Sequence, residues 1–186
     1  MMSLEALIES LPEAQRRHLD PLSPPQARMM AAKGLLPLPP REVVIILAGL
    51  TMDPDETLSE TARASIDKLP DRIFAFAVDA GLPPVALGII ARLVAQRDAL
   101  LEQIAVQRAT PDDALAVIAP HVSERIAEIL AADQERCLRC ENLVRGIRGN
   151  PHIAKSSLDR LFDFLVRSGV VFDDMPEFAE SLARLS

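Results

Sequence analysis

A proline followed four positions later by a leucine recurs at a nearly constant interval through the middle of the chain. The three matching pairs are Pro54 with Leu58, Pro83 with Leu87, and Pro111 with Leu115. The prolines are 29 and 28 residues apart, and a further 28 residues lead from Leu115 to Leu143. Self-similarity at a fixed period is typical of stacked structural repeats, so this spacing restricts the fold more than any single motif does.

Other positions of the repeat keep the same type of residue relative to the four leucines at 58, 87, 115 and 143, called the marker leucines below. Four positions after them stand Ala62, Ala91, Ala119 and Ile147. Fourteen and eleven positions before them stand Val44, Ile73, Leu101 and Ile129, and then Leu47, Phe76, Ile104 and Ala132. Ten positions before them alanine fills three units, and Asp133 breaks the pattern in the fourth. This spacing predicts two antiparallel helices in each unit, whose apolar stripes are buried only against the neighbouring units.

The composition and the proline positions both favour an all-helical chain. Apolar residues make up 49% of the sequence but aromatic residues only 3%, so aliphatic side chains must form the core. The 15 prolines fall mostly between apolar-periodic runs, where proline fits the first turn of a helix. These runs predict helices near residues 3–10, 24–34, 40–50, 56–68, 71–79, 84–95, 98–107, 111–119, 122–132, 141–148, 155–167 and 176–185. Ser23, Asp55 and Thr110 stand where a side-chain oxygen would cap the helix that follows.

We expect these helices to form a right-handed α-solenoid of stacked antiparallel pairs, with capping helices at both ends. Residues 1–38 are predicted to form a proline-rich N-terminal helical cap, residues 39–167 a helical repeat domain, and residues 168–186 a C-terminal capping helix. Such covers are expected because the end units of a solenoid would otherwise expose an apolar face.

Several stretches resemble known helical repeats. Residues 53–70, DPDETLSETARASIDKLP, resemble the second helix of a HEAT-type repeat, in which Asp-Pro, a leucine and an alanine four residues later recur. Residues 80–93 and 108–119 resemble the leucine-rich-variant repeats found in bacteria, and residues 149–165 are similar in their Asn-Pro opening. The resemblance covers roughly residues 39–167 and implies a superhelical scaffold without a particular activity. Leucine-rich-variant repeats can be preceded by a cysteine cluster for an iron–sulfur centre, which this chain lacks.

The sequence shows no set of residues with the spacing of a catalytic, cofactor or metal site. Cys137 and Cys140 form a C-x-x-C pair of the kind that redox enzymes and zinc sites use, but the context is helical and no second cysteine pair exists. We interpret the pair as structural or incidental. His18, His121 and His152 are too dispersed for a triad or a metal site. We therefore expect a non-enzymatic protein with no cofactor.

Charge is distributed unevenly along the chain. The formal net charge is −7, yet residues 136–167 carry seven basic side chains against three acidic ones. Six of the basic residues are predicted to bind a partner: Arg136, Arg139, Arg145, Arg148, Lys155 and Arg160. Two interpretations stay open, a surface suited to an acidic partner or a phosphate, and a face bound intramolecularly to the acidic repeats.

The expected function is a protein–protein interaction scaffold or regulatory adaptor whose basic C-terminal units grip an acidic partner. A nucleic-acid-binding helical-repeat protein is the alternative, although the net charge argues against such binding over the whole surface. An enzyme with unrecognised groups is the third and weakest hypothesis. No membrane partner is expected, because the most apolar run, residues 43–50, is far shorter than the roughly 20 residues that span a bilayer. The N-terminal residues lack the pattern of a signal peptide, which predicts a cytoplasmic location.

Overall fold

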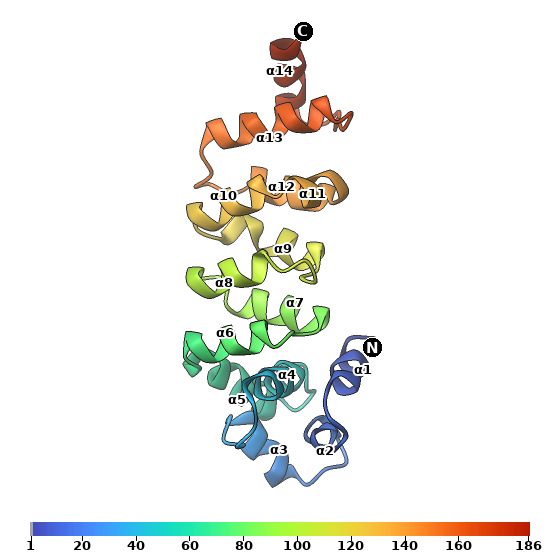
Figure 1. Cartoon of the computed structure of the whole chain (residues 1–186), viewed down its shortest axis with the longest axis vertical. Coiled ribbons are helices and arrows are strands. Elements are labelled where there is room, and N and C mark those ends of the chain that lie inside the picture. Colours follow the sequence, from blue (N-terminus) through green and yellow to red (C-terminus); the bar gives the residue numbers. More distant parts are fainter. Residues whose placement is uncertain (1) are drawn as a thin grey trace. The chain divides into compact units, whose positions relative to one another are not determined.

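The computed structural model describes the backbone of residues 2–186 and the side chains of residues 4–186. Over this range the chain is all-helical and contains no strand (Figure 1). The helices are α1 (Met2–Ser10), α2 (Glu13–Arg16), α3 (Pro25–Ala32), α4 (Pro40–Leu50), α5 (Glu56–Lys68), α6 (Asp71–Asp79), α7 (Pro84–Leu93), α8 (Asp98–Ala105), α9 (Asp112–Ile118), α10 (Glu124–Ala132), α11 (Gln134–Arg139), α12 (Glu141–Arg148), α13 (Lys155–Arg167) and α14 (Pro176–Leu185), with 3-10 turns at Arg17–Leu19 and Ala119–His121. Every predicted helix is present within two residues of its expected bounds, so the all-α prediction is confirmed.

Two short helices, α2 and α11, were not expected from the sequence. They have four and six residues, which is too short for an apolar stripe to repeat. The helix α11 begins beside Asp133, whose carboxylate accepts a hydrogen bond from the main-chain N–H of Arg136 at 3.2 Å. This cap starts a helix in a segment that reads as a loop by periodicity alone.

The predicted helix caps have different outcomes. Asp55 caps α5 as expected, since its carboxylate accepts a hydrogen bond from the main-chain N–H of Leu58 at 3.3 Å. The expectation for Ser23 is wrong, because its hydroxyl donates to the carbonyl of Arg17 at 2.6 Å and no side chain caps α3. The hydroxyl of Thr110 donates backward, to the main-chain carbonyl of Ile104 at 2.5 Å. A hydroxyl group can donate and accept at the same time, so this bond does not decide whether Thr110 also caps α9.

The chain divides into two compact units, one running to Pro111 and the other comprising Asp112–Ser186. The boundary falls between α8 and α9, the two helices that the sequence pairs in one repeat. None of the helices that the structure describes is long and apolar enough to cross a membrane, and the longest, α5 and α13, have 13 residues each.

Helix α4 forms the centre of the first unit. Its residues 44–50 are all buried, and it contacts α1, α3, α5, α6 and α7. Helix α6 also packs against α8, so that α4, α6 and α8 are successive neighbours (Figure 1). Leu19 lies against α4 at Gly49, where an added Cβ would stand 2.6 Å from the leucine Cδ2 atom. The N-terminal segment therefore covers part of α4 at close range.

Helix α12 forms the centre of the second unit and contacts α9, α10 and α11. The α9–α12 approach depends on Gly146, where an added Cβ would lie 2.7 Å from the carbonyl oxygen of Ala116 and 3.0 Å from the Cβ of Ala119. The buried amide of Asn150 donates to the carbonyls of Ala119 and Val122 at 2.7 and 2.9 Å, which fixes the turn after α12 to the segment between α9 and α10. Helix α13 packs against α10, α11 and α14.

The repeat positions are buried unevenly. All four marker leucines are at most 3% exposed, and the residues four positions after them are fully buried. In the first helix of each sequence repeat the burial is less regular: Phe76 is 60% exposed, and Ala132 is also exposed. The buried residues of α6 are Phe74, Ala77 and Val78. The expectation that Phe76 faces the core is wrong, because apolar residues throughout this short helix allow its stripe to be placed one residue off.

Candidate functional site

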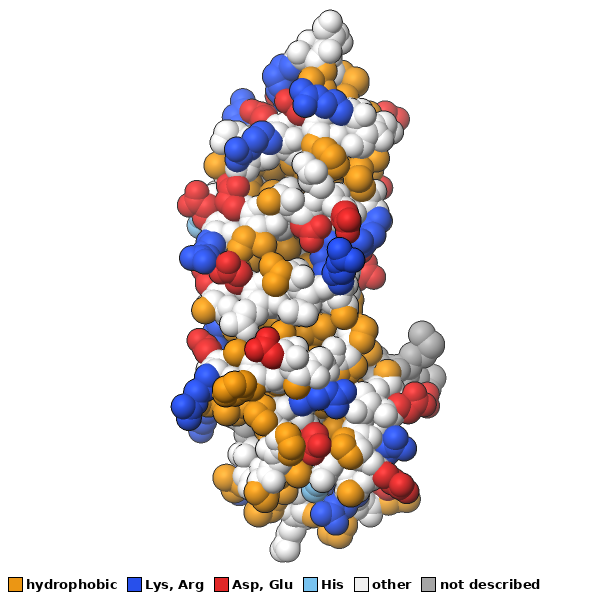
Figure 2. All heavy atoms as spheres, in the orientation of Figure 1, with side chains coloured by type: hydrophobic (Ala, Val, Ile, Leu, Met, Phe, Trp, Pro, Cys, Tyr) orange, Lys and Arg blue, Asp and Glu red, His pale blue; other side chains and the backbone are white. Residues whose placement is uncertain are grey.

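The six basic residues predicted to bind a partner all lie in the second unit, on three different helices. Arg136 and Arg139 belong to α11, Arg145 and Arg148 to α12, and Lys155 and Arg160 to α13. On the face shown in Figure 2, basic and acidic side chains are interspersed and form no extended surface of one sign. The structure separates the six residues into three pairs with different surroundings.

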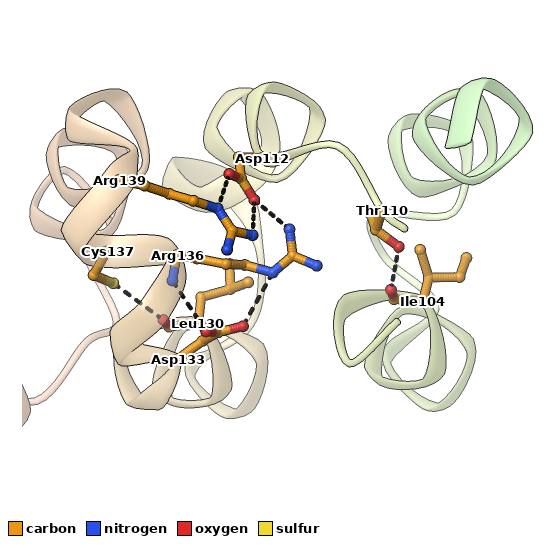
Figure 3. A network of polar contacts seen from close by, with 8 residues as sticks. All are labelled: Ile104, Thr110, Asp112, Leu130, Asp133, Arg136, Cys137 and Arg139. Carbon is orange, nitrogen blue, oxygen red and sulfur yellow. Dashed lines mark hydrogen bonds and ion pairs between the residues drawn. The ribbon is translucent and has the colours of Figure 1, made fainter. Parts of the chain in front are cut away.

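The α11 pair is bound internally by Asp112 at the start of α9 (Figure 3). The side chain of Arg136 is only 3% exposed, forms an ion pair with Asp112, and donates from Nε to Asp133 Oδ2 at 3.0 Å. Arg139 donates two hydrogen bonds to the same Asp112 carboxylate, at 2.6 and 3.0 Å. The hydrogen bond from Arg139, opposed by burial and aided by Arg136, lowers the pKa of Asp112. These contacts connect α9 to α11, so Arg136 is part of the internal packing and not of an outer face.

The two cysteines lie in the same region, and they differ in burial, since Cys140 is half-buried. Cys137 is fully buried, and its thiol donates to the carbonyl of Leu130 at 3.5 Å. Burial, with a smaller contribution from Asp133, raises the pKa of the Cys137 thiol to about 12, so the nucleophilic thiolate is disfavoured.

No group of three metal-ligating side chains that could hold an ion occurs among the residues described. Burial and the nearby Arg17 lower the pKa of His18, which lies in the first unit.

The α12 pair is bound by the C-terminal segment, residues 168–186, called the tail below. Arg145 donates to both carboxylate oxygens of Asp174, at 2.7 and 3.0 Å, and also pairs with Glu141 on its own helix. Arg148 donates from Nε to Glu177 Oε1 at 2.7 Å. The hydrogen bond from Arg145 lowers the pKa of Asp174, so the acid is held in its charged form.

The α13 pair has no carboxylate bound to it within the part of the chain that the structure describes. Lys155 and Arg160 are both exposed, and Arg160 donates to the hydroxyl of Ser157 at 2.9 Å. Arg160 lines a hollow of about 340 Å³ between α10 and α13. The other lining residues are Glu128, Ala131, Ala132, Gln134, Ser157, Leu161 and Phe164. An arginine without a bound carboxylate therefore lines a partly apolar groove, which we call the α10–α13 groove.

Sequence reasoning identified the basic residues but not the acids that bind four of them. Asp112, Asp174 and Glu177 lie 24 to 29 residues from their arginines, which is close to the repeat length. A search for opposite charges one repeat apart would have found these pairs. Comparison of the chain with protein-family models, curated proteins and solved structures found no match.

Proposed function

We propose that this protein is a non-enzymatic helical-repeat scaffold that binds an acidic surface of another protein through the α10–α13 groove. The observation that carries the proposal is the position of Arg160, a cation without a bound carboxylate beside the partly apolar lining of that groove. Arginine and aromatic side chains are enriched where proteins bind one another, and the groove offers both, with Phe164 in its wall.

We further propose the architecture expected from the repeat, a right-handed α-solenoid of stacked antiparallel pairs resembling HEAT and leucine-rich-variant repeats. Support comes from ion pairs between an arginine and an acid 24 to 29 residues away, which occur in both compact units of the chain. The pairs are Arg28 with Asp53, Arg97 with Asp71, Arg136 with Asp112, Arg145 with Asp174, and Arg148 with Glu177. In a stack of similar units, residues one repeat apart lie on neighbouring layers and can reach each other. Polar contacts at this interval are what such a stack produces.

The internal pairing of four arginines also weighs against the alternative of nucleic-acid binding. Binding to a polyanion gains most of its affinity from cations that neutralise phosphates and release counterions. Only Lys155 and Arg160 of the six predicted residues lack a bound carboxylate among the described side chains. Action in the cytoplasm stays a prediction of the sequence.

The test compares affinity capture from a host lysate by three forms of the full chain: wild type, Arg160→Glu, and Arg63→Glu as a control. Arg63 is an exposed arginine of α5 in the first unit, so both variants change the charge equally. We expect a protein that wild type and Arg63→Glu retain and that Arg160→Glu loses, with thermal melting unchanged in both variants. Equal capture by all three forms would refute the groove as the binding site. Loss of the captured protein on nuclease treatment would favour a nucleic-acid bridge instead.

A further inference from the structure

The tail binds Arg145 and Arg148 through acidic and aromatic side chains. Residues 168–186 contain four acidic side chains against a single arginine. Besides the ion pairs of Asp174 and Glu177, the Phe172 ring lies 5.6 Å from the guanidinium of Arg145, within the range of a cation–π contact. The arginines of α12 are thus already bound by a peptide segment of defined chemistry.

The apolar anchor of the tail is Phe178, which is 1% exposed. Its ring packs edge to face against Phe162 of α13, with 4.8 Å between the ring centroids, and against Phe172 at 5.1 Å. The surface beneath the tail therefore comprises two cations and an aromatic side chain, Arg145, Arg148 and Phe162. We call it the tail-covered surface.

We propose that the tail is an internal substitute for a partner, and that the tail-covered surface binds an acidic, aromatic segment of another protein when the tail is displaced. The tail shows what such a segment needs: two carboxylates three residues apart, at the positions of Asp174 and Glu177, followed directly by an aromatic residue at that of Phe178. The inference rests on the proposed protein-binding function but uses a surface distinct from the α10–α13 groove.

The contacts of the tail are of a kind that a competing segment can replace. Arg145 and Asp174 are 38% and 64% exposed, and ion pairs at such exposure are weak and screened by salt. Because the tail is tethered, its high effective concentration blocks a free segment until its own anchor is weakened.

The test adds a labelled synthetic peptide with the sequence of residues 170–186 to the full chain and measures binding by fluorescence anisotropy. The anchor variant is Phe178→Ala, and the matched control is Leu182→Ala, which truncates a 45% exposed side chain of the same helix. We expect Phe178→Ala to bind the peptide at least tenfold more tightly than either wild type or Leu182→Ala. A peptide with the carboxylates at positions 174 and 177 replaced by amides should not bind.

Two further substitutions in the Phe178→Ala background separate this inference from the proposed function. Arg145→Glu should abolish peptide binding, whereas Arg160→Glu in the α10–α13 groove should leave it unchanged. Peptide binding lost only with Arg160→Glu would overturn the tail-covered surface as the site. If Phe178→Ala loses its helical circular dichroism, the double variant Asp174→Asn/Glu177→Gln replaces it with the same expectations.

Equal binding of the peptide by wild type and by the weakened variants would overturn the proposal. Light scattering on the weakened variant without peptide tests the other possible occupant of the tail-covered surface, the tail of a second copy of the chain. Dimers that form as the concentration rises would show that the tail of a second copy fills the surface, and would overturn its assignment to a different protein. A monomer that binds the peptide supports the proposal.

Discussion

The buried ion pair between Asp112 and Arg136 offers a direct test of how α9 and α11 are held together. Replacing Asp112 by Asn removes the negative charge that pairs with Arg136, which is 3% exposed and still bound to Asp133. It also leaves one acceptor oxygen where Arg139 now bonds to two. Removing one partner of a buried ion pair costs about 3–5 kcal/mol. Because the ion pair with Asp133 remains and Asp112 itself is 22% exposed, we expect a loss below that range, about 2–3 kcal/mol of unfolding free energy. For a chain of this size that loss lowers Tm by about 5–10 °C.

The matched control is Asp113→Asn, which removes an exposed carboxylate from the same first turn of α9. Both variants lose the favourable charge at the helix N-terminus, worth about 0.3–1 kcal/mol, so the difference between them measures the ion pair. Thermal and urea unfolding at pH 7 supply the two values. A Tm of Asp112→Asn within about 1 °C of the Asp113→Asn value would refute the assignment of Arg136 as a buried cation held by Asp112.

The same pair predicts a pH dependence. Hydrogen bonding from Arg139 and Arg136 lowers the pKa of Asp112 below the value of about 3.9 for an unfolded aspartate. The stabilisation is therefore fully present above that unfolded pKa and is lost as the pH falls through the lower, folded one. We expect the gap in urea midpoint between wild type and Asp112→Asn to be constant from pH 7 to about 5 and to close below about pH 4. A gap that stays constant to pH 3 would contradict the charge on Asp112 as its origin.

Two further substitutions test the packing. Gly146→Ala places a Cβ 2.7 Å from the carbonyl oxygen of Ala116 and should lower the unfolding free energy, measured in urea, by about 1–3 kcal/mol. The control Gly149→Ala should leave it unchanged, because its Cβ meets no atom closer than 3.5 Å. Equal urea midpoints for the two variants would contradict the close α9–α12 approach. Leu115→Asp places a carboxylate at a fully buried marker position and should abolish the cooperative thermal transition seen by far-UV circular dichroism, a result that an unchanged melting curve would exclude.

The sequence alone determined where the helices lie and which second-helix positions are buried. Prolines separate the apolar runs, and a stripe of period 3.6 is a property of consecutive residues, so all the longer helices could be located without tertiary information. The marker leucines were identified in the same way, since a large apolar residue that recurs once per sequence repeat is expected to be buried in every repeat. Helix α6 shows the limit of the method: with apolar residues at 73 to 78, only packing against α4 and α8 decides that Phe74 is buried and Phe76 exposed.

Only the tertiary structure decided which basic side chains are bound to an acid of the same chain and which are not. Arg136 and Arg160 are alike in the sequence, yet one is buried on Asp112 and the other lines an open groove. The difference arises because an ion pair joins side chains 24 to 29 residues apart, and whether they meet depends on which helices become neighbours. Local patterns fix each helix and its apolar stripe, because they act over one or two turns. Charge pairing between distant segments is settled only when their helices pack together, since a hydrogen-bonded ion pair needs its atoms within a few ångströms of each other, whatever their separation along the chain.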